Sequence, residues 1–517
     1  MNAESEPTRG EPVRTWAALV ALLAAAVYAN TLGHGFVWDD NTIVLGDPAI
    51  RSLSSIPSFF ARSYWGEADP EFKLYRPLVQ TTLAIDWAIG RGSAVPFHAT
   101  NLLLHVLATL LAFHLFRGLH DELPWAVLAS ALFAVHPVHT DAVDSIVQRA
   151  ELLSAIGVMG GLLAALRGRW LVLALCAAVG LLSKETAAML PLLLAGWHLL
   201  GDRARRPRWP AYAVSIGVLA LYGVARWKVL GTATGMHAAF GDVSVGERAL
   251  TMTWVFGDYV RLLLVPWPLC ADYAVNTNPL VRVTSAADPR FLSAALALST
   301  LAIVWCVAAA RRWRGAFWGA WAAIALLPVS NVLLPIGAIE AERFLYLPSV
   351  GACALLAWIF AGSRAQRIGL VIVILFALVT LDRNQVWKDH LTLLDARMAE
   401  APENPWPYFR RAEILLNEGR LREAEPYLDH ALEVMPNFEK ARQLRAGVRY
   451  GVGRMKGAAE DLEALLTAHP DWWQTMVALG SAYGRLGDWE RFEATLERLR
   501  SAGHPADADS LDREFQD

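Results

Sequence analysis

The stretch FLSAALALSTLAIVWCVAAA, residues 291–310, is followed directly by Arg311-Arg312-Trp313-Arg314. These twenty consecutive residues without a charge are long enough for a helix to cross the hydrocarbon core of a bilayer, which is about 30 Å thick. A basic cluster at the end of such a stretch is typical of the cytoplasmic side of a membrane span. The segment therefore predicts an integral membrane protein.

Ten further segments are also largely apolar, and two of them, 125–139 and 170–183, are shorter. With 291–310 they give eleven predicted spans: 15–31, 97–116, 125–139, 150–166, 170–183, 186–200, 209–229, 291–310, 315–333, 344–361 and 368–381. Hydrophobic residues make up 55% of the chain and charged residues only 18%, which agrees with a bilayer as the solvent of most of it. We predict an all-α, polytopic membrane domain over 15–381.

The basic residues between these segments predict the orientation. They are Arg117, Arg167, Arg169, Arg203, Arg205, Arg206, Arg208, Arg311, Arg312, Arg314, Arg364 and Arg367. All can face the cytoplasm together if 249–265 is an interfacial or re-entrant helix. Residues 1–14 are then a cytoplasmic tail, 33–95 is an extracytoplasmic loop, and everything after Leu381 is extracytoplasmic. The short basic clusters and the net charge of −3 predict no nucleic-acid partner.

The last part of the chain repeats with a period of 34. Pro402, Pro436 and Pro470 are spaced at this interval, as are Gly419, Gly453 and Gly487. A small residue in the first helix, Gly at the turn and Pro at the exit resemble tetratricopeptide repeats. After a linker helix over 382–401 we predict about three such units over 402–517, whose concave surface binds a protein or, alternatively, serves self-assembly.

Two adjacent acids, Asp39 and Asp40, follow the first predicted span. Adjacent carboxylates beside an apolar surface repel each other, so the pKa of one is expected to rise, as suits a general base. The alternative is a helix cap or a solvated loop.

Further polar residues stand at the ends of later spans. His98, Asn101 and His105 share one helix face, which we interpret as a structural contact between helices. The stretch 136–151 offers His136, His139, Asp141 and Arg149, and Arg76 stands in the first predicted extracytoplasmic loop. A divalent cation on the histidines and the acids is possible, but the spacing is loose, so we assign no metal ligand and expect the histidines to orient the acidic pair.

Two cations are candidates for binding a lipid-linked phosphate. Lys184-Glu185 follows one span, and Arg343 precedes another with Glu340 and Glu342 beside it. Arg offers two parallel N–H donors and Lys a point charge. The alternatives are snorkelling and a pairing of Arg343 with Glu340 or Glu342. The predicted topology puts all of these residues on the extracytoplasmic side.

The ordered motifs resemble the transmembrane and tetratricopeptide-repeat O-mannosyltransferases and their bacterial relatives, of the GT-C glycosyltransferase class. They are Phe36-Val37-Trp38-Asp39-Asp40, Tyr75-Arg76-Pro77-Leu78, the run 97–105, the run 136–143, Lys184-Glu185 and the run 342–351. The match covers most of the chain.

The resemblance implies a transferase that moves a mannose-like sugar from a polyprenyl-phosphate donor to a hydroxyl, such as a protein Ser or Thr. By the resemblance Asp39 is the base and Asp40 helps to position substrate or donor. Lys184 and Arg343, with Arg149, bind the lipid phosphate. Arg76, His136, His139, Asp141, Glu185 and Glu342 line or orient the pocket. The resemblance also implies a bacterial inner membrane, with membrane lipids around the spans and an extracytoplasmic acceptor protein on the repeats.

Two other classes stay open: a membrane-anchored scaffold without catalysis and a transporter. A transporter predicts charges near the bilayer midplane and duplicated halves. A scaffold needs no cluster of charges at one membrane surface.

Overall fold

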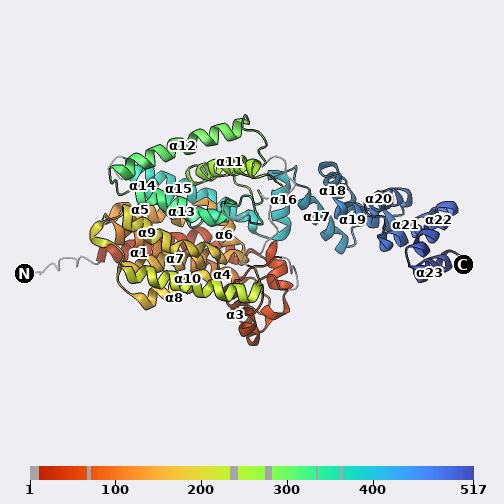
Figure 1. The fold of residues 1–517 in the computed structure, drawn as a ribbon, viewed down its shortest axis with the longest axis horizontal. Helices are drawn as coiled ribbons and strands as arrows, with labels where there is room; N and C mark the ends of the chain where they lie inside the picture. Colours follow the sequence, from red (N-terminus) through yellow and green to blue (C-terminus); the bar gives the residue numbers. More distant parts are fainter. Residues whose placement is uncertain are drawn as a thin grey trace, which may run out of the picture. The chain divides into compact units, whose positions relative to one another are not determined.

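The computed structural model describes residues 11–66, 72–120, 122–232, 243–273, 282–332, 336–360 and 365–516. Within these ranges every regular element is a helix and none is a strand, which confirms the predicted all-α class. Contacts divide the chain into two units, Met1–Leu393 and Leu394–Asp517 (Figure 1).

The first unit is a bundle of apolar helices joined by short turns. Its helices are α1 (Glu11–Tyr28), α2 (Ile56–Phe59), α3 (Pro77–Gly90), α4 (Val95–Leu119), α5 (Leu123–Ala134), α6 (Thr140–Asp144), α7 (Arg149–Leu166), α8 (Trp170–Leu181), α9 (Leu190–Leu200), α10 (Trp209–Leu230), α11 (Val245–Leu264), α12 (Pro289–Ala310), α13 (Ala316–Leu326), α14 (Pro348–Ile359) and α15 (Ala365–Asn384). Proline at the first turn starts several of them, including α4, α10, α12 and α14, because its missing N–H has no partner there in any case.

Six helical stretches are long and apolar enough to cross a membrane. They are Val13–Gly33, Val95–Leu119, Ile146–Leu166, Trp209–Leu230, Pro289–Ala310 and Ala365–Trp387. The bent pair Leu123–Ala134 and Pro137–Asp144 makes a seventh candidate, and shorter apolar helices lie at Trp170–Leu181, Glu185–Leu200, Ala316–Val329 and Pro348–Ile359. The protein is therefore a multi-pass membrane protein. A helix lies at each predicted span, while the count of eleven crossings stays a prediction; residues 333, 361 and Arg364 lie outside the described ranges.

Helix α7 lies at the centre of the bundle, and 83% of its most apolar window is buried. It packs closely on α8, where a Cβ on Gly157 would stand 2.6 Å from the backbone of Cys176 and Gly180. Small residues are what allow two membrane helices to approach so closely. This contact fixes the start of α7 next to the turn after α8, and both contribute to the site described below.

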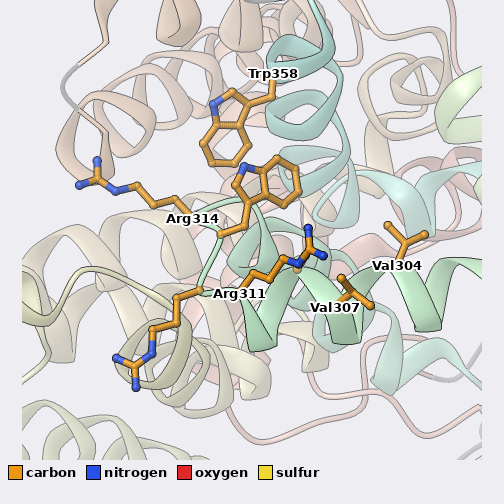
Figure 2. A pocket seen from close by; sticks show the side chains of 8 residues that line it. Val304, Val307, Arg311, Arg314 and Trp358 are labelled. Carbon is orange, nitrogen blue, oxygen red and sulfur yellow. The ribbon is translucent and has the colours of Figure 1, made fainter.

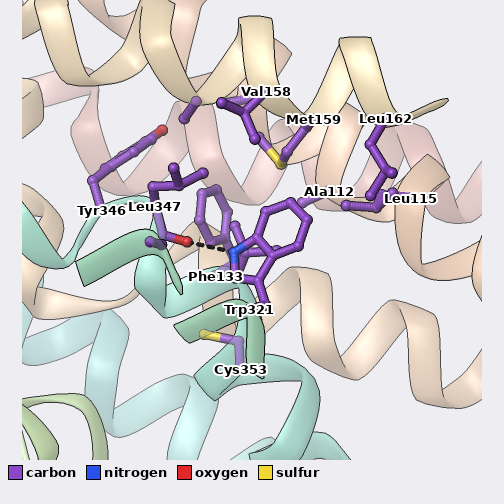
Figure 3. Packing of buried hydrophobic residues seen from close by; sticks show 14 of the residues in the cluster. Ala112, Leu115, Phe133, Val158, Met159, Leu162, Trp321, Tyr346, Leu347 and Cys353 are labelled. Atoms are coloured by element: carbon purple, nitrogen blue, oxygen red, sulfur yellow. Dashed lines mark hydrogen bonds between the residues drawn. The ribbon is translucent and has the colours of Figure 1, made fainter. Parts of the chain in front are cut away.

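The main core joins α4, α5, α7, α13 and α14 through large apolar side chains (Figure 3). Trp321 is fully buried, and its indole N–H donates to the carbonyl of Leu347 at 2.9 Å. His105, buried on α4, contacts the Tyr346 hydroxyl at 2.9 Å and the Ala134 carbonyl at 3.1 Å. Asn101 on the same face donates to the carbonyls of Val143 and Ser145. The polar face of α4 therefore serves helix packing, in agreement with the structural interpretation.

Helix α11 is long enough to span a membrane but too rich in charged residues to count among the candidate spans, and it lies along α12 (Figure 1). Its buried face carries Met252, Val255, Tyr259 and Leu262, while the charged Asp258 and Arg261 pair with each other. Such an amphipathic helix fits the prediction that 249–265 is not an ordinary span.

The second unit consists of antiparallel helix pairs. Its helices are α16 (His390–Glu400, which begins in the first unit), α17 (Pro405–Asn417), α18 (Leu421–Val434), α19 (Glu439–Gly451), α20 (Met455–Ala468), α21 (Trp473–Leu486), α22 (Trp489–Ser501) and α23 (Pro505–Gln516). Gly419, Gly453 and Gly487 stand at the turns within the pairs, with φ of +74°, +82° and +72°. Only glycine adopts this backbone region without steric cost, which is why glycine recurs every 34 residues.

The two ends of the membrane bundle can be followed along single helices. At one end, Arg149 starts α7 and donates to the Phe97 carbonyl near the start of α4. At the other end, Arg205 donates to the Gly118 carbonyl near the end of α4 at 2.6 Å. The described arginines of the predicted topology map gather at this second end, which we call the arginine end. The opposite end, with Asp39 and Arg149, we call the paired-charge end.

Candidate active site

The acidic pair lies in a short loop between a 3-10 turn, Ala29–Gly33, and a π-helical turn, Asn41–Leu45. Asp40 is fully buried, and its two oxygens accept the backbone N–H of Val37 at 3.1 Å and of Val147 at 3.0 Å. Asp39 is only partly buried. Two adjacent carboxylates therefore have different surroundings, and Asp39 is the one that a substrate can reach.

The residue before the pair has a strained backbone. Trp38 has a φ of +45°, in the left-handed region that a large side chain rarely adopts. Its N–H donates to Nδ1 of His390 at 3.2 Å, and Gly35 N–H donates to the Lys388 carbonyl at 2.8 Å. An imidazole nitrogen that accepts a hydrogen bond carries no proton. Strain of this kind persists where the surroundings enforce it, and it clusters at functional sites.

Burial raises the pKa of Asp40 from its ordinary 3.8 to about 7, although the N–H groups of Val37 and Val147 act against the shift. The neighbouring charge of Asp39 raises this pKa further. The prediction that one acid of the pair has a raised pKa thus falls on Asp40. Its hydrogen bonds show that Asp40 holds the loop in place.

The two predicted phosphate-binding cations both contact the aromatic ring of Phe344. The ammonium of Lys184 lies 5.1 Å and the guanidinium of Arg343 lies 5.3 Å from the centre of the Phe344 ring. Lys184 is buried and paired with Glu151 at the start of α7, and Arg343 is paired with Asp141 at 3.2 Å. The Phe344 ring and the two carboxylates thus hold both cations in fixed positions.

Electrostatic interactions connect Asp39 to Arg343, and Arg343 to Lys184. Burial alone would lower the pKa of Arg343, but Asp141, Asp39 and Glu151 raise it on balance. Burial lowers the pKa of Lys184; Glu151 opposes this, whereas the positive charges of Arg76 and Arg343 lower it further. The structure therefore brings the predicted base and both phosphate candidates into one charged cluster.

The sequence left open a pairing of Arg343 with Glu340 or Glu342. The structure does not show this pairing. The partner of Arg343 is Asp141, which accepts both the backbone N–H and a guanidinium N–H of Arg343, because α6 packs against the turn Glu342–Leu345. Glu342 instead accepts from the Cys270 N–H and the Tyr273 hydroxyl. Burial raises the pKa of Glu342 to about 8.

Arg149, which the resemblance assigned to the phosphate set, already has partners within the bundle. Its side chain is fully buried, with Nη1 on Asp86 at 2.6 Å and the other two nitrogens on the carbonyls of Phe97 and Ile146. All three nitrogens are engaged, so a phosphate would have to displace existing partners. Arg149 therefore joins α3, α4 and α7, and the role assigned to it by resemblance gains no support.

Arg76 and Glu185 lie at the edge of the cluster. Glu185 accepts from Arg76 at 3.2 Å and from Arg226 of α10 at 2.8 Å. The Arg76 guanidinium also lies 5.7 Å from the centre of the Tyr64 ring. Burial, together with Asp39 and Asp40, raises the pKa of the Tyr64 hydroxyl, although Arg76 opposes the shift. Arg76 thus links the edge of the cluster to the acidic loop.

The two histidines form hydrogen bonds outside the acidic pair. Nε2 of His136 contacts the Leu263 carbonyl at 3.2 Å, and Nε2 of His139 contacts the Ser349 hydroxyl at 2.8 Å. His136 thereby contacts α11, and His139 contacts α14. Among the described residues, no three His, Cys, Asp or Glu side chains converge as metal ligands. The possible divalent cation therefore gains no support from this geometry.

Sequence reasoning missed several members of the cluster. Glu151 and Asp86 neutralise Lys184 and Arg149, Arg226 completes the Glu185 pair, and His390 contacts Trp38. A single acid in an otherwise apolar helix, such as Asp86 in α3, is a signal in itself, because an unpaired charge on a buried helix face is costly. His390 gave no signal, since 352 residues separate it from Trp38.

The comparisons with known proteins find similarity to O-mannosyl-transferases. A family model described as Protein O-mannosyl-transferase TMTC, DUF1736, matches residues 239–302. The chain is 28% identical over 456 residues to Protein O-mannosyl-transferase F38B6.6 of Caenorhabditis elegans, covering 84% of this chain and 65% of that protein. It is 27% identical over 495 residues to human Protein O-mannosyl-transferase TMTC3, covering 86% and 54%.

A second human relative, Protein O-mannosyl-transferase TMTC4, is 26% identical over 487 residues, covering 80% of this chain and 65% of that protein. The chain thus spans about half to two-thirds of the length of these curated relatives. No solved structure matches the chain. The similarity includes both the membrane bundle and part of the helix pairs, and each of these relatives is a Protein O-mannosyl-transferase.

Proposed function

We propose that this chain is a membrane glycosyltransferase of the GT-C class that transfers a mannose-like sugar from a polyprenyl-phosphate donor to a hydroxyl of an extracytoplasmic protein. The observation that carries the proposal is one charged cluster: a partly exposed Asp39 on a strained loop, with Arg343 and Lys184 on the Phe344 ring. The names of its relatives support a mannosyl donor and a protein acceptor.

The geometry supplies the parts that such a transfer needs. The acceptor oxygen attacks the anomeric carbon, the bond from that carbon to the phosphate oxygen breaks, and Asp39 takes the acceptor proton. The polyprenyl phosphate leaves with the bonding electrons and an added negative charge. Arg343 and Lys184 stabilise this charge, an electrostatic contribution that is large in a site shielded from water.

The pairing of the cations suits this role. Glu151 and Asp141 keep Lys184 and Arg343 charged and oriented before the donor arrives. Arg343 is the more accessible of the two, with a side chain 27% exposed against 6% for Lys184. In the proposed arrangement Arg343 therefore meets the phosphate first, and Lys184 sets the depth to which it enters.

The helix pairs of the second unit are proposed to be tetratricopeptide repeats that dock the acceptor protein. The predicted topology places them on the extracytoplasmic side of a bacterial inner membrane, as it does Asp39. Concave solenoid surfaces commonly bind extended peptides. The scaffold alternative keeps this docking but gives no role to the paired cluster around Asp39.

The proposal is tested with the purified chain, a polyprenyl-phosphate mannose and a Ser/Thr-containing acceptor protein. Asp39→Asn is expected to lower kcat by about a thousandfold or more while donor binding stays intact, because the variant loses only the base. The matched control is Asp47→Asn, a carboxylate of the same loop that pairs with Arg62 at 2.5 Å. Full activity in Asp39→Asn would remove the proposed base.

Deleting 402–517 tests the docking role. The truncated chain is expected to bind the donor and to transfer sugar poorly to proteins, with transfer to short peptides less affected. Unchanged protein glycosylation would reject docking by the helix pairs.

A further inference from the structure

A hollow of about 690 Å³ lies at the arginine end, outside the cluster around Asp39. Figure 2 shows Val304 and Val307 on α12, Trp358 on α14, and Arg311 and Arg314 on the connection that follows α12. Its size is within the usual range of small-molecule sites. Val304 and Val307 make one wall of the hollow aliphatic, and the arginines make its mouth basic.

The basic residues at the mouth are available for a ligand. Arg311, Arg312 and Arg314 are exposed, and no described carboxylate forms an ion pair with any of the three guanidinium groups. This differs from the paired-charge end, where Lys184, Arg76 and Arg343 each have an acidic partner. Three neighbouring cations without counter-charges favour an anion.

The aromatic residues place the hollow at a membrane surface. Trp313 and Trp358 lie with ring centres 4.9 Å apart, and Trp313 is 46% exposed. Tryptophan is enriched at the level of the lipid headgroups. Only 6% of the most apolar window of α12 is buried, so the wall with Val304 and Val307 faces the hydrocarbon.

We propose that this hollow binds an anionic glycerophospholipid, with the phosphate at Arg311, Arg312 and Arg314 and an acyl chain along Val304 and Val307. The site needs both parts of its ligand. A free phosphate uses only the arginines, and a zwitterionic lipid carries no net charge for them to attract. A lipid enters from the bilayer, because the aliphatic wall is open on that side.

The arginines alone also have a simpler role, that of fixing the topology of the spans. The sequence contains a matched cluster for separating the two roles. Arg203, Arg206 and Arg208 are equally exposed in the connection between α9 and α10, and none of them lines the hollow. If the arginines only fix the topology, replacing either cluster should change lipid binding by the same amount.

The experiment is native mass spectrometry of the full chain in detergent, titrated with phosphatidylglycerol or phosphatidylcholine. The unmodified chain is expected to retain phosphatidylglycerol at least tenfold more tightly than phosphatidylcholine. Arg311→Gln, Arg312→Gln and Arg314→Gln together are expected to weaken retention by about a hundredfold, on the basis of about fivefold for each basic residue at a membrane surface. The matched triple Arg203→Gln, Arg206→Gln and Arg208→Gln is expected to change it less than threefold.

Val307→Trp separates the lipid from free phosphate, because it fills the hollow and keeps every charge. It is expected to weaken phosphatidylglycerol retention at least tenfold while binding of inorganic phosphate stays the same. The proposal is overturned if both triple variants lose lipid equally, if Val307→Trp retains it fully, or if millimolar inorganic phosphate displaces it completely.

Discussion

The two ends of the membrane bundle use charge in opposite ways. At the paired-charge end, Arg149 and Lys184 are buried and each has a carboxylate partner, Asp86 and Glu151. At the arginine end, Arg311, Arg312 and Arg314 are exposed and have no described acidic partner.

The difference shows that the paired-charge end is the one that holds its charged side chains in a fixed geometry. Moving two charges out of water costs several kcal/mol for each ion, and a buried pair returns this only with good geometry. A bundle that needed stability alone would do as well with apolar residues at these positions. Exposed arginines carry no such cost, so their presence needs only a membrane surface or an anion.

The largest expected effect comes from leaving a buried charge without its partner. Glu151→Gln keeps the shape of the side chain but leaves Lys184 unpaired, and should destabilise the chain by about 3–5 kcal/mol. The measurement is thermal unfolding in detergent, with loss of transfer as a second readout. Removing both charges, with Glu151→Leu and Lys184→Met, is expected to recover stability and not activity. If activity also recovers, the pair is only structural.

Asp40 gives the stability of the chain a pH dependence. Its pKa of about 7 in the folded chain lies above the ordinary 3.8, so folding favours the protonated carboxyl. The resulting stability is fully present below about pH 4 and is lost as the pH rises through about 7, a change of up to a few kcal/mol. Asp40→Asn is expected to flatten the unfolding temperature between pH 4 and 8. An unchanged slope in this variant would assign the dependence to another group.

His390 is expected to affect the rate without affecting donor binding. Removing the acceptor of the Trp38 N–H with His390→Ala relaxes the strained loop, which should lower kcat about tenfold and leave KM nearly unchanged, a loss of about 1.4 kcal/mol of transition-state stabilisation. His390→Gln offers an oxygen that can accept the same N–H and should recover most of the rate. A rise in KM alone, with no recovery in the Gln variant, would contradict this positioning role.

The smallest effect is expected at the arginine end. Replacing Arg311, Arg312 and Arg314 by Gln should change the unfolding free energy by less than about 0.5 kcal/mol in detergent, as for other exposed substitutions. Transfer in detergent should stay within about twofold. A larger loss of transfer would mean that the two ends are coupled.

The features that sequence predicted well are local ones. A run such as 291–310 identifies a membrane helix by itself, and Gly419, Gly453 and Gly487 report turns by their spacing, since each depends on neighbouring residues only. The ordered motifs also indicated a likeness to O-mannosyl-transferases, which are the relatives found. They brought Asp39, Lys184 and Arg343 to attention because each stands at the end of an apolar helix.

The partners of these residues could not be predicted in the same way. Arg149 and Asp86 are 63 residues apart, Arg343 and Asp141 are 202 apart, and Trp38 and His390 are 352 apart. Helix packing decides which ends meet, and many pairings satisfy the same hydropathy. Arg149 is an example: the sequence shows a cation near a membrane surface, but not that Asp86 and two carbonyls already engage its three guanidinium nitrogens.

The central claim is that the donor phosphate binds at the paired-charge end. The most direct test is photo-crosslinking of a polyprenyl-phosphate sugar analogue that carries its reactive group next to the phosphate, mapped by mass spectrometry of the full chain. The account predicts crosslinks to residues around Lys184 and Phe344, abolished by Arg343→Gln combined with Lys184→Met. Crosslinks at Trp313 or Trp358 that persist in this variant would place the donor at the arginine end and contradict the account.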